Sequence, residues 1–306
     1  MRVLMFGRGT IATIYGWALQ TSGHEVEFYV RPGRAAEYGD EVRMDLIDGR
    51  RRALGQRIST SFHTTLRETL DPADGFDLIV LSVGHHHLVE AAAFLAPRLG
   101  NATVLVLGNI WDEPLAAVAP LPADQVVFGF PLAGGGFGAD GVLHGALLRS
   151  LIIGSADESP SQRERDVRAA LEQAGVSIRV EKDMHGWLQI HFVSDAGMFA
   201  QAVRSGGMAN MIGDRRAFRD AFLTSRELLP VLKARGVDLR LHRNATLPYR
   251  FPRLIGTMTA WATSLPIFQV SLASHTDPHA AEPSAVLEDT RREARRLNIR
   301  APRLAP

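Results

Sequence analysis

The stretch MRVLMFGRGTIA, residues 1–12, decides the fold of the first half of the chain. Its apolar run Val3–Phe6 predicts a strand, and Thr10–Ser22 has the apolar spacing of a helix. A short glycine-containing turn joins the two. A strand followed at once by such a turn and a helix is typical of the first unit of a nucleotide-binding α/β domain.

The residues of this turn match the sequence Gly-x-Gly-x-x-Ala. Gly7 allows a tight turn, Gly9 lets the backbone approach a pyrophosphate, and Ala12 is small enough for helix and strand to pack closely. The N-terminus of the helix supplies N–H donors to phosphate groups. We therefore predict a cofactor-binding turn, with an ordinary glycine turn as the alternative. Its members are Gly7, Arg8, Gly9, Thr10 and Ile11.

Outward from this turn, short apolar runs alternate with helical spacing. Further strands are predicted at Glu25–Val30, Leu78–Val83, Thr103–Leu107, Val126–Phe130, Leu148–Ile153 and Val176–Val180, and helices at Leu88–Arg98 and 160–174. Near-continuous apolar strands separated by helices indicate a parallel sheet covered on both faces.

After Gly186 helical spacing replaces the strand pattern. Helices are predicted at Trp187–Val203, Arg215–Arg235, Phe251–Ser264 and Ala285–Leu297. We expect an α/β fold, with a Rossmann-type doubly wound parallel sheet over residues 1–183. An all-helical domain for substrate binding and dimerisation then covers residues 184–306.

Composition excludes several kinds of chemistry. The 306 residues include no cysteine, so a disulfide, a catalytic thiolate, a cysteine-bound zinc ion and an iron–sulfur cluster are all excluded. Only Lys182 and Lys233 are lysines among 34 basic residues. The net charge of +1 gives no reason to expect nucleic acid, and no stretch reaches the ~18 apolar residues of a membrane helix. We expect a cytoplasmic protein whose partners are a small-molecule substrate and, at most, a second copy of the chain.

The second predicted strand indicates the type of cofactor. An NAD site places an acidic residue at the end of this strand, about 20 residues after the glycines. Here the chain reads Arg31-Pro32-Gly33-Arg34. Arginine offers a charged fork to a 2′-phosphate, so Arg31, helped by Arg34, favours NADP(H). Surface arginines beside an NAD site are the alternative.

Several motifs across nearly the whole chain resemble, in order and spacing, the ketopantoate reductase family of two-domain, NADPH-dependent reductases of 2-keto acids. They are Gly7-Arg8-Gly9, Arg31-Pro32, Leu105-Val106-Leu107-Gly108-Asn109, Asp140-Gly141-Val142-Leu143-His144, Trp187, Glu282 and Ile299-Arg300-Ala301-Pro302.

The resemblance implies roles for individual residues. Asn109 is expected beside the nicotinamide and the substrate, and Glu282 is expected to face the substrate from the helical domain. Val83 and Gly84, at the end of the fourth predicted strand, are expected to contact the cofactor. Gly7, Gly9 and Ala12 are implied for the pyrophosphate, and Arg31 for the 2′-phosphate.

The sequence also departs from the family pattern. The catalytic lysine of the family lies two residues after the tryptophan, where this chain has Gln189. Two substrate-binding asparagines appear as Val193 and Gly197, and a second lysine as Val83. A neutral glutamine donates a hydrogen bond but delivers no proton to a developing alkoxide. We therefore expect Gln189 and Val193 to contact a substrate other than ketopantoate.

A histidine, or a water molecule held by Gln189, is the candidate for the missing proton donor. His191 lies two residues after Gln189 and so points away from it on a helix, whereas Asp195 shares its face. This is either a His–Asp pair or an ordinary helix histidine. His86, within the run His85–His87 after the fourth strand, is the second candidate, since loops at strand C-termini line the ligand crevice in such folds.

A third group of polar residues precedes Glu282. Ser271, His275 and the segment through His279 are expected to form a polar loop that contacts the substrate. No metal site is expected here, because no fourth ligand is evident.

Three functions follow from these residues. The first is an NADPH-dependent reductase that transfers hydride in the interdomain cleft to a carbonyl or imine carbon of a small substrate. The second is a catalytically silent NADP(H)-binding sensor or partner protein. The third is true 2-dehydropantoate reduction with a replaced general acid.

Overall fold

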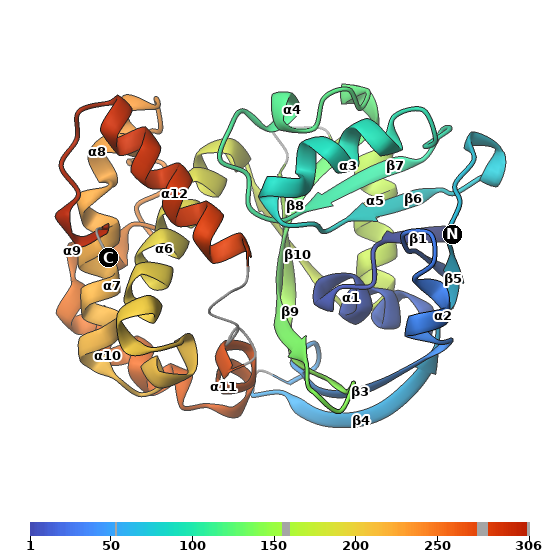
Figure 1. The fold of residues 1–306 in the computed structure, drawn as a ribbon, viewed down its shortest axis with the longest axis horizontal. Coiled ribbons are helices and arrows are strands. Elements are labelled where there is room, and N and C mark those ends of the chain that lie inside the picture. The colour runs from blue at the N-terminus through green and yellow to red at the C-terminus, as the bar shows by residue number, and fades with distance from the viewer. Residues whose placement is uncertain (53, 155–159, 274–280, 305–306) are drawn as a thin grey trace. The chain divides into compact units, whose positions relative to one another are not determined.

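The computed structural model describes residues 1–52, 54–154, 160–273 and 281–304. It divides into two compact units (Figure 1). Unit 1 contains Met1–Gly108 and Asp112–Met184, and unit 2 contains Asn109–Trp111 and His185–Pro306. Asn109–Trp111 therefore group with the helices, although their position in the sequence lies inside the predicted first domain.

In the described residues of unit 1, ten strands form one sheet. They are β1 (Arg2–Phe6), β2 (Glu25–Tyr29), β3 (Glu41–Asp48), β4 (Gln56–His63), β5 (Thr65–Arg67), β6 (Leu78–Leu81), β7 (Thr103–Leu107), β8 (Val126–Phe137), β9 (Leu143–Gly154) and β10 (Ser177–Glu181). The order is β4-β3-β9-β8-β7-β6-β1-β2-β5, and β10 pairs with the end of β9. The neighbouring strands β8, β7, β6, β1, β2 and β5 are all parallel to one another, which confirms the predicted parallel sheet.

The helices of unit 1 are α1 (Thr10–Thr21), α2 (Ala35–Tyr38), α3 (Leu88–Leu95), α4 (Pro114–Ala117) and α5 (Gln162–Gln173). Helices α1 and α3 cover opposite faces of the sheet. Gly16 of α1 lies against Met5 and Phe28, whereas Phe94 of α3 packs on Phe6 and Tyr29. Because adjacent residues of a strand point to opposite faces, the sheet is doubly wound.

Three strands were not predicted, and two were predicted too short. The long hairpin of β3 and β4 is antiparallel, as are β8 and β9, so the sheet is mixed beyond the central strands (Figure 1). Strand β3 alternates Val42, Met44 and Leu46 with polar residues, and these three are buried. This two-residue period is the signal of a half-buried strand.

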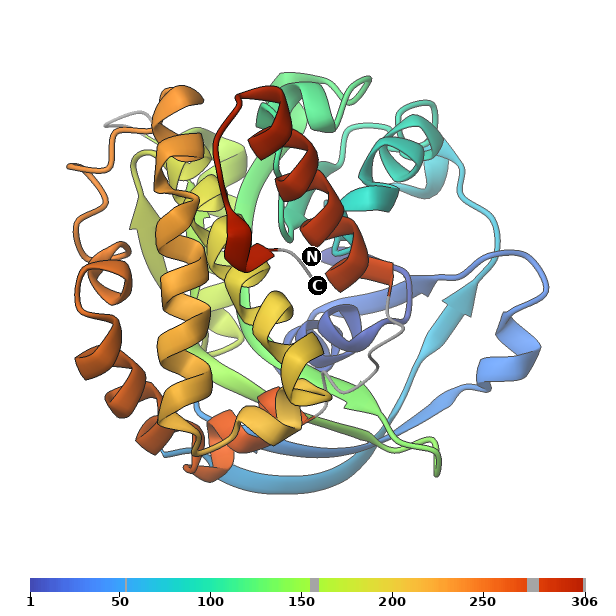
Figure 2. The same ribbon diagram turned by 60° about the vertical axis from the view of Figure 1, so that its left-hand side comes forward.

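Unit 2 is helical, as predicted. It contains α6 (Met184–Ser205, begun by the last residue of unit 1), α7 (Arg215–Glu227), α8 (Leu229–Ala234), α9 (Leu247–Arg250), α10 (Pro252–Thr263), α11 (Pro266–Ala273) and α12 (Ala281–Arg296). Figure 2 shows the helices gathered around α7, and its Phe218 lies in the apolar core with Phe192 of α6. The predicted helix Arg215–Arg235 is broken between α7 and α8, next to Pro230, which has no backbone N–H to donate.

Gly16 gives a test of how closely α1 packs on the sheet. A Cβ atom on Gly16 would lie 2.5 Å from Cζ of Phe28. Although alanine favours a helix over glycine by about 1 kcal/mol, we expect Gly16→Ala to lower the free energy of unfolding by about 1–3 kcal/mol through overpacking. Urea unfolding checks this, with Thr21→Ala at the exposed end of the same helix as a control that changes it by less than about 0.5 kcal/mol.

Candidate functional site

The glycine turn of unit 1 presents its backbone to open space. Gly7 adopts φ +100°, which favours glycine, and its N–H donates to the carbonyl oxygen of Tyr29 over 2.9 Å. Gly9 is the N-cap of α1 and has no side chain to fill the cap position. A Cβ atom on either glycine would have no neighbour within 4 Å. The turn therefore fits a pyrophosphate against Thr10 and Ile11 at the start of α1.

Strand pairing brings the segment after β2 beside this turn. Phe6 of β1 is in register with Tyr29 of β2, so both strands end at the same edge of the sheet. Arg31 is exposed, and within the described ranges its guanidinium makes no ion pair. Arg34 is held more firmly: its Nε lies 3.0 Å from Glu37, and it donates to the hydroxyl of Tyr38 over 3.3 Å.

A carboxylate fixes the backbone of this segment. Glu68 follows β5, the strand paired with β2, and accepts a hydrogen bond from the N–H of Ala35 over 2.8 Å. Backbone hydrogen bonds from Ala35, Gly33 and Arg34 lower the pKa of Glu68, so it remains ionised. The sequence reasoning missed Glu68, because its role depends on the pairing of β2 with β5.

Tyr38 also belongs to this edge and was not predicted. The guanidinium of Arg8 lies 4.9 Å from the centre of its ring, and that of Arg34 lies 5.1 Å from it. Arg8 also donates to the carbonyl oxygen of Glu41, and burial lowers its pKa. One aromatic ring therefore holds two arginines beside the glycine turn.

The loop after β6 lies at the same edge. An ideal Cβ on Gly108, after β7, would be 3.4 Å from the carbonyl oxygen of Val83. Gly84 begins a 3-10 turn formed by His85–His87, and the three rings lie in sequence against one another. His86 is exposed there. The structure thus places Val83, Gly84 and His86 at the carboxyl ends of the parallel strands, as predicted from the fold.

In unit 2, Asn109 joins His191 and Asp195 of α6. Its amide nitrogen donates to Oδ2 of Asp195 over 2.7 Å, and its amide oxygen lies 3.1 Å from Nδ1 of His191. Nδ1 of His191 is also 3.5 Å from Oδ2 of Asp195. The three side chains close a triangle of polar contacts, which we call the Asn–His–Asp cluster. The His–Asp pair was one of the two alternatives that the sequence left open for His191. The contact of His191 with Asn109 joins residues 82 positions apart and has no signal in the sequence.

Gln189 points to a different side of α6. Its side chain is 2% exposed, and its amide oxygen accepts from Nε of Arg235 over 3.0 Å. Its amide nitrogen lies 2.5 Å from Nε2 of His185. Arg235 further donates to Glu293 and to the carbonyl oxygen of Trp111, and lies 4.2 Å from the ring of Trp111. Gln189 is thus a member of a buried arginine network, here called the Arg235 network.

The neighbours of Gln189 on α6 are buried as well. Val193 has no exposed area and lies in the core of unit 2. A Cβ atom on Gly197 would be 2.1 Å from the hydroxyl of Ser225 and 2.5 Å from the carbonyl oxygen of Ala221. Glutamine, valine and glycine at the positions implied for the family's lysine and asparagines therefore all face inward here.

The remaining predicted substrate residues lie on other helices. Ser271 is half-buried on α11, and Glu282 is half-buried in the first turn of α12. His275 falls outside the described residues. Among the residues that are described, no three His, Cys, Asp or Glu side chains gather as a metal site would require. No helix in those ranges has the length and hydropathy of a membrane span.

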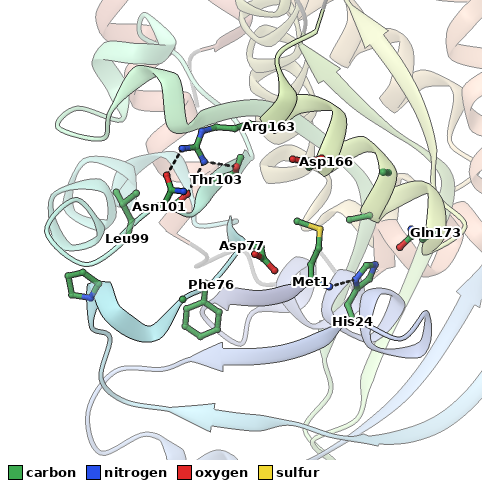
Figure 3. Close-up of a pocket in the computed structure, with 14 residues that line it drawn as sticks. Met1, His24, Phe76, Asp77, Leu99, Asn101, Thr103, Arg163, Asp166 and Gln173 are labelled. Atoms are coloured by element: carbon green, nitrogen blue, oxygen red, sulfur yellow. Dashed lines mark hydrogen bonds between the residues drawn. The ribbon is translucent and has the colours of Figure 1, made fainter.

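Unit 1 also has a cavity of about 790 Å³ away from the glycine turn (Figure 3). Met1, His24, Asp77 and Thr103 line it, and each lies at or just before the start of a parallel strand. Arg163 closes one side by donating to Asn101 and Thr103. Ligands of such sheets bind at the carboxyl ends of the strands, so this cavity is not the candidate cofactor site.

Comparison with known proteins agrees with the fold. The family model of ketopantoate reductase PanE/ApbA matches residues 3–158, which is half of the chain. The search of curated proteins found no match to this chain.

Among solved structures, a 2-dehydropantoate 2-reductase from Geobacter metallireducens GS-15 has 17% identity and a TM-score of 0.70 over 99% of this chain and 96% of the other. D-mandelate dehydrogenase with NADH and anilino(oxo)acetate has 12% identity and a TM-score of 0.68 over 99% and 95%. A 2-dehydropantoate 2-reductase from Porphyromonas gingivalis W83 has 15% identity and a TM-score of 0.65 over 99% and 96%. At these identities the likeness is one of fold.

The Arg235 network gives a pH-dependent prediction. Hydrogen bonds from Arg296 and Arg235 lower the pKa of Glu293 to about 2, and the Arg235 and Glu293 side chains are only 16% and 10% exposed. We expect Glu293→Gln to lower the free energy of unfolding by about 1–3 kcal/mol at pH 7, because it leaves a buried guanidinium without its charged partner.

A depressed carboxyl pKa stabilises the fold above its ordinary value of 4.5, and this contribution is lost as the pH falls toward 2. The difference between wild type and Glu293→Gln in urea unfolding should therefore shrink between pH 5 and the acid limit. Glu288→Gln, on the same helix but with a 55% exposed side chain, is the matched control and should show little effect at any pH. A difference that stays constant down to the acid limit would contradict this assignment.

Proposed function

This chain belongs to the ketopantoate reductase PanE/ApbA family, and we propose that it is an NADPH-dependent reductase of a carbonyl or imine carbon in a small substrate other than ketopantoate. The observation that carries the proposal is the open turn at Gly7 and Gly9 with Arg31 at the adjacent strand end. Backbone N–H groups at a helix N-terminus donate hydrogen bonds to a pyrophosphate, and an arginine without an ion pair among the described residues suits a 2′-phosphate.

Three sets of residues would hold the cofactor. Gly7, Gly9 and the first turn of α1 would bind the pyrophosphate. Arg31 would bind the 2′-phosphate with help from Arg34 and Arg8, both held on the ring of Tyr38. Val83 and Gly84 would contact the cofactor from the loop after β6. Bound NADPH would supply a hydride.

The chain's own residues would orient the substrate and provide its proton. Asn109 and Glu282 remain the proposed orienting residues, and Ser271 and His275 are proposed substrate contacts. Gln189 and Val193 are poor candidates for direct contact, since both side chains are buried and Gln189 is bound by Arg235. Either His86 or His191 would then provide the proton.

The burial of Gln189 also favours the second candidate, an NADP(H)-binding protein without turnover. A panel of keto acids, ketones and imines separates the two. We expect NADPH oxidation, followed at 340 nm, with at least one compound and little with ketopantoate. Tight NADPH binding with no oxidation across the panel would support the silent protein instead, and rapid ketopantoate reduction would support the third candidate.

Arg31 tests the cofactor assignment. We expect Arg31→Glu to weaken NADPH binding by tenfold or more, roughly the loss of one to two charge-assisted hydrogen bonds, while NADH binding changes little. Calorimetric titration with both cofactors measures the ratio. Arg52→Glu, an exposed arginine outside the turn, is the matched control for a change of net charge. Equal selectivity in Arg31→Glu and wild type would contradict the 2′-phosphate site.

A further inference from the structure

We propose that His191 is the general acid of this protein and that Asp195 and Asn109 hold it in place for that role. The inference rests on the proposed reductase function and names the proton donor within it. It also gives a physical reason why the chain needs no lysine at position 189.

The Asn–His–Asp cluster fixes the tautomer of His191. Because the amide nitrogen of Asn109 donates to Asp195, its amide oxygen is the atom that faces Nδ1 of His191. Nδ1 therefore carries a proton and donates to Asn109, with the Asp195 carboxylate 3.5 Å away. The proton exchanged with a substrate is then the one on Nε2. A ring held through Nδ1 by an acceptor and a carboxylate is the arrangement that keeps an acid–base histidine oriented.

Helix α6 presents this cluster on its half-exposed face. Trp187, His191, Asp195 and Met198 follow a spacing of three or four residues and are each partly exposed. The His191 side chain is 27% exposed and its ring stacks on Trp187, with the centres 5.2 Å apart. Gln189 lies about 160° to 200° around the helix from His191, and its side chain is buried. The group able to carry a proton is therefore on the face that a small molecule can reach.

A carboxylate lies beside His191. It belongs to Asp195 of the same helix, whose Oδ2 is 3.5 Å from Nδ1 of the ring. Burial raises the pKa of Tyr249 of α9 to about 12, so its hydroxyl stays neutral. Arg235 and Glu293 of α12 form an ion pair in the Arg235 network with Gln189, not in the cluster. Asp195 thus places a negative charge where it can hold the ring through Nδ1.

Hydride addition to the substrate carbon breaks the π bond of C=O or C=N and leaves the electron pair on oxygen or nitrogen. That atom takes the proton from Nε2 of the His191 imidazolium, which becomes a neutral imidazole. Solvent then restores the proton. Asp195 takes no part in the proton transfer itself, because its part is to orient the ring with Asn109.

The first experiment compares kcat for the panel substrate in wild type, His191→Gln and His63→Gln. We expect His191→Gln to lower kcat by about a hundredfold or more and to remove its decline at alkaline pH, because the remaining side chain cannot titrate. NADPH affinity should not change, since His191 lies outside the cofactor residues. His63→Gln, a histidine of β4 with a 66% exposed side chain, should leave kcat unchanged.

Asp195→Asn separates orientation from charge. It keeps the shape and a hydrogen-bonding group but removes the carboxylate. We expect kcat to fall by about tenfold or more with KM little changed, and the ¹⁵N NMR signals of the His191 ring in the cofactor-free protein to report a changed tautomer. The NMR measurement does not depend on turnover.

The outcomes distinguish the inference from the function. If wild type oxidises NADPH with a panel compound but His191→Gln keeps the kcat and pH profile of wild type, His191 is not the acid and the inference fails alone. If Asp195→Asn leaves both kcat and the ring signals of His191 as they are in wild type, the proposed role of Asp195 fails. If wild type binds NADPH and oxidises it with no compound, the reductase function fails and the inference falls with it.

Discussion

The parallel pairing of β2, β1, β6 and β7 is the constraint on which the candidate sites of unit 1 depend. Parallel strands end at the same edge, so this pairing collects the Gly7 turn, Arg31 and the loop at Val83 and Gly84. The hydrogen bond from Gly7 N–H to Tyr29 extends the pairing by one step into the turn. Side chains outside these strands, Tyr38 of α2 and Glu68 after β5, then hold the segment that follows β2 in place.

Asn109 is the residue at which the chain passes from β7 of unit 1 into unit 2. It follows Gly108 directly after β7, yet its side chain belongs to the polar cluster of α6, and Trp111 stacks on Phe192 of the same helix. The rotation of α6 is fixed on the other side by Arg235, whose guanidinium is nearly buried and must keep its acceptors. Gln189 and Glu293 provide them. A lysine at position 189 would place a second cation against Arg235. Glutamine instead accepts a hydrogen bond from this buried arginine.

Much of the fold can be predicted from local patterns of apolar residues in the sequence. The strand, turn and helix at the start of the chain, the central parallel strands and the helical second half all have periodicities that appear in the sequence. Strand β3 was missed although Val42, Met44 and Leu46 alternate, because charged residues between them hid the pattern. The site was less predictable. The glycine turn and Arg31 are adjacent to their strands, whereas the partners of His191 and Gln189 come from distant residues, Asn109 and Arg235, whose contacts arise only on folding.

Under the proposed role of His191, the proton donor differs from a lysine in more than its identity. A lysine ammonium stays charged at neutral pH, so it stabilises an alkoxide and rarely acts as a base. An imidazole can exchange a proton in both directions near neutral pH, provided that its other ring nitrogen holds it in a fixed orientation. The Asn–His–Asp cluster offers that orientation with groups already present on α6 and at the end of β7. The Arg235 network holds Gln189 on the buried side of α6 and leaves His191 on the half-exposed side. In the proposed mechanism, the identity of the proton donor therefore depends on this orientation of α6.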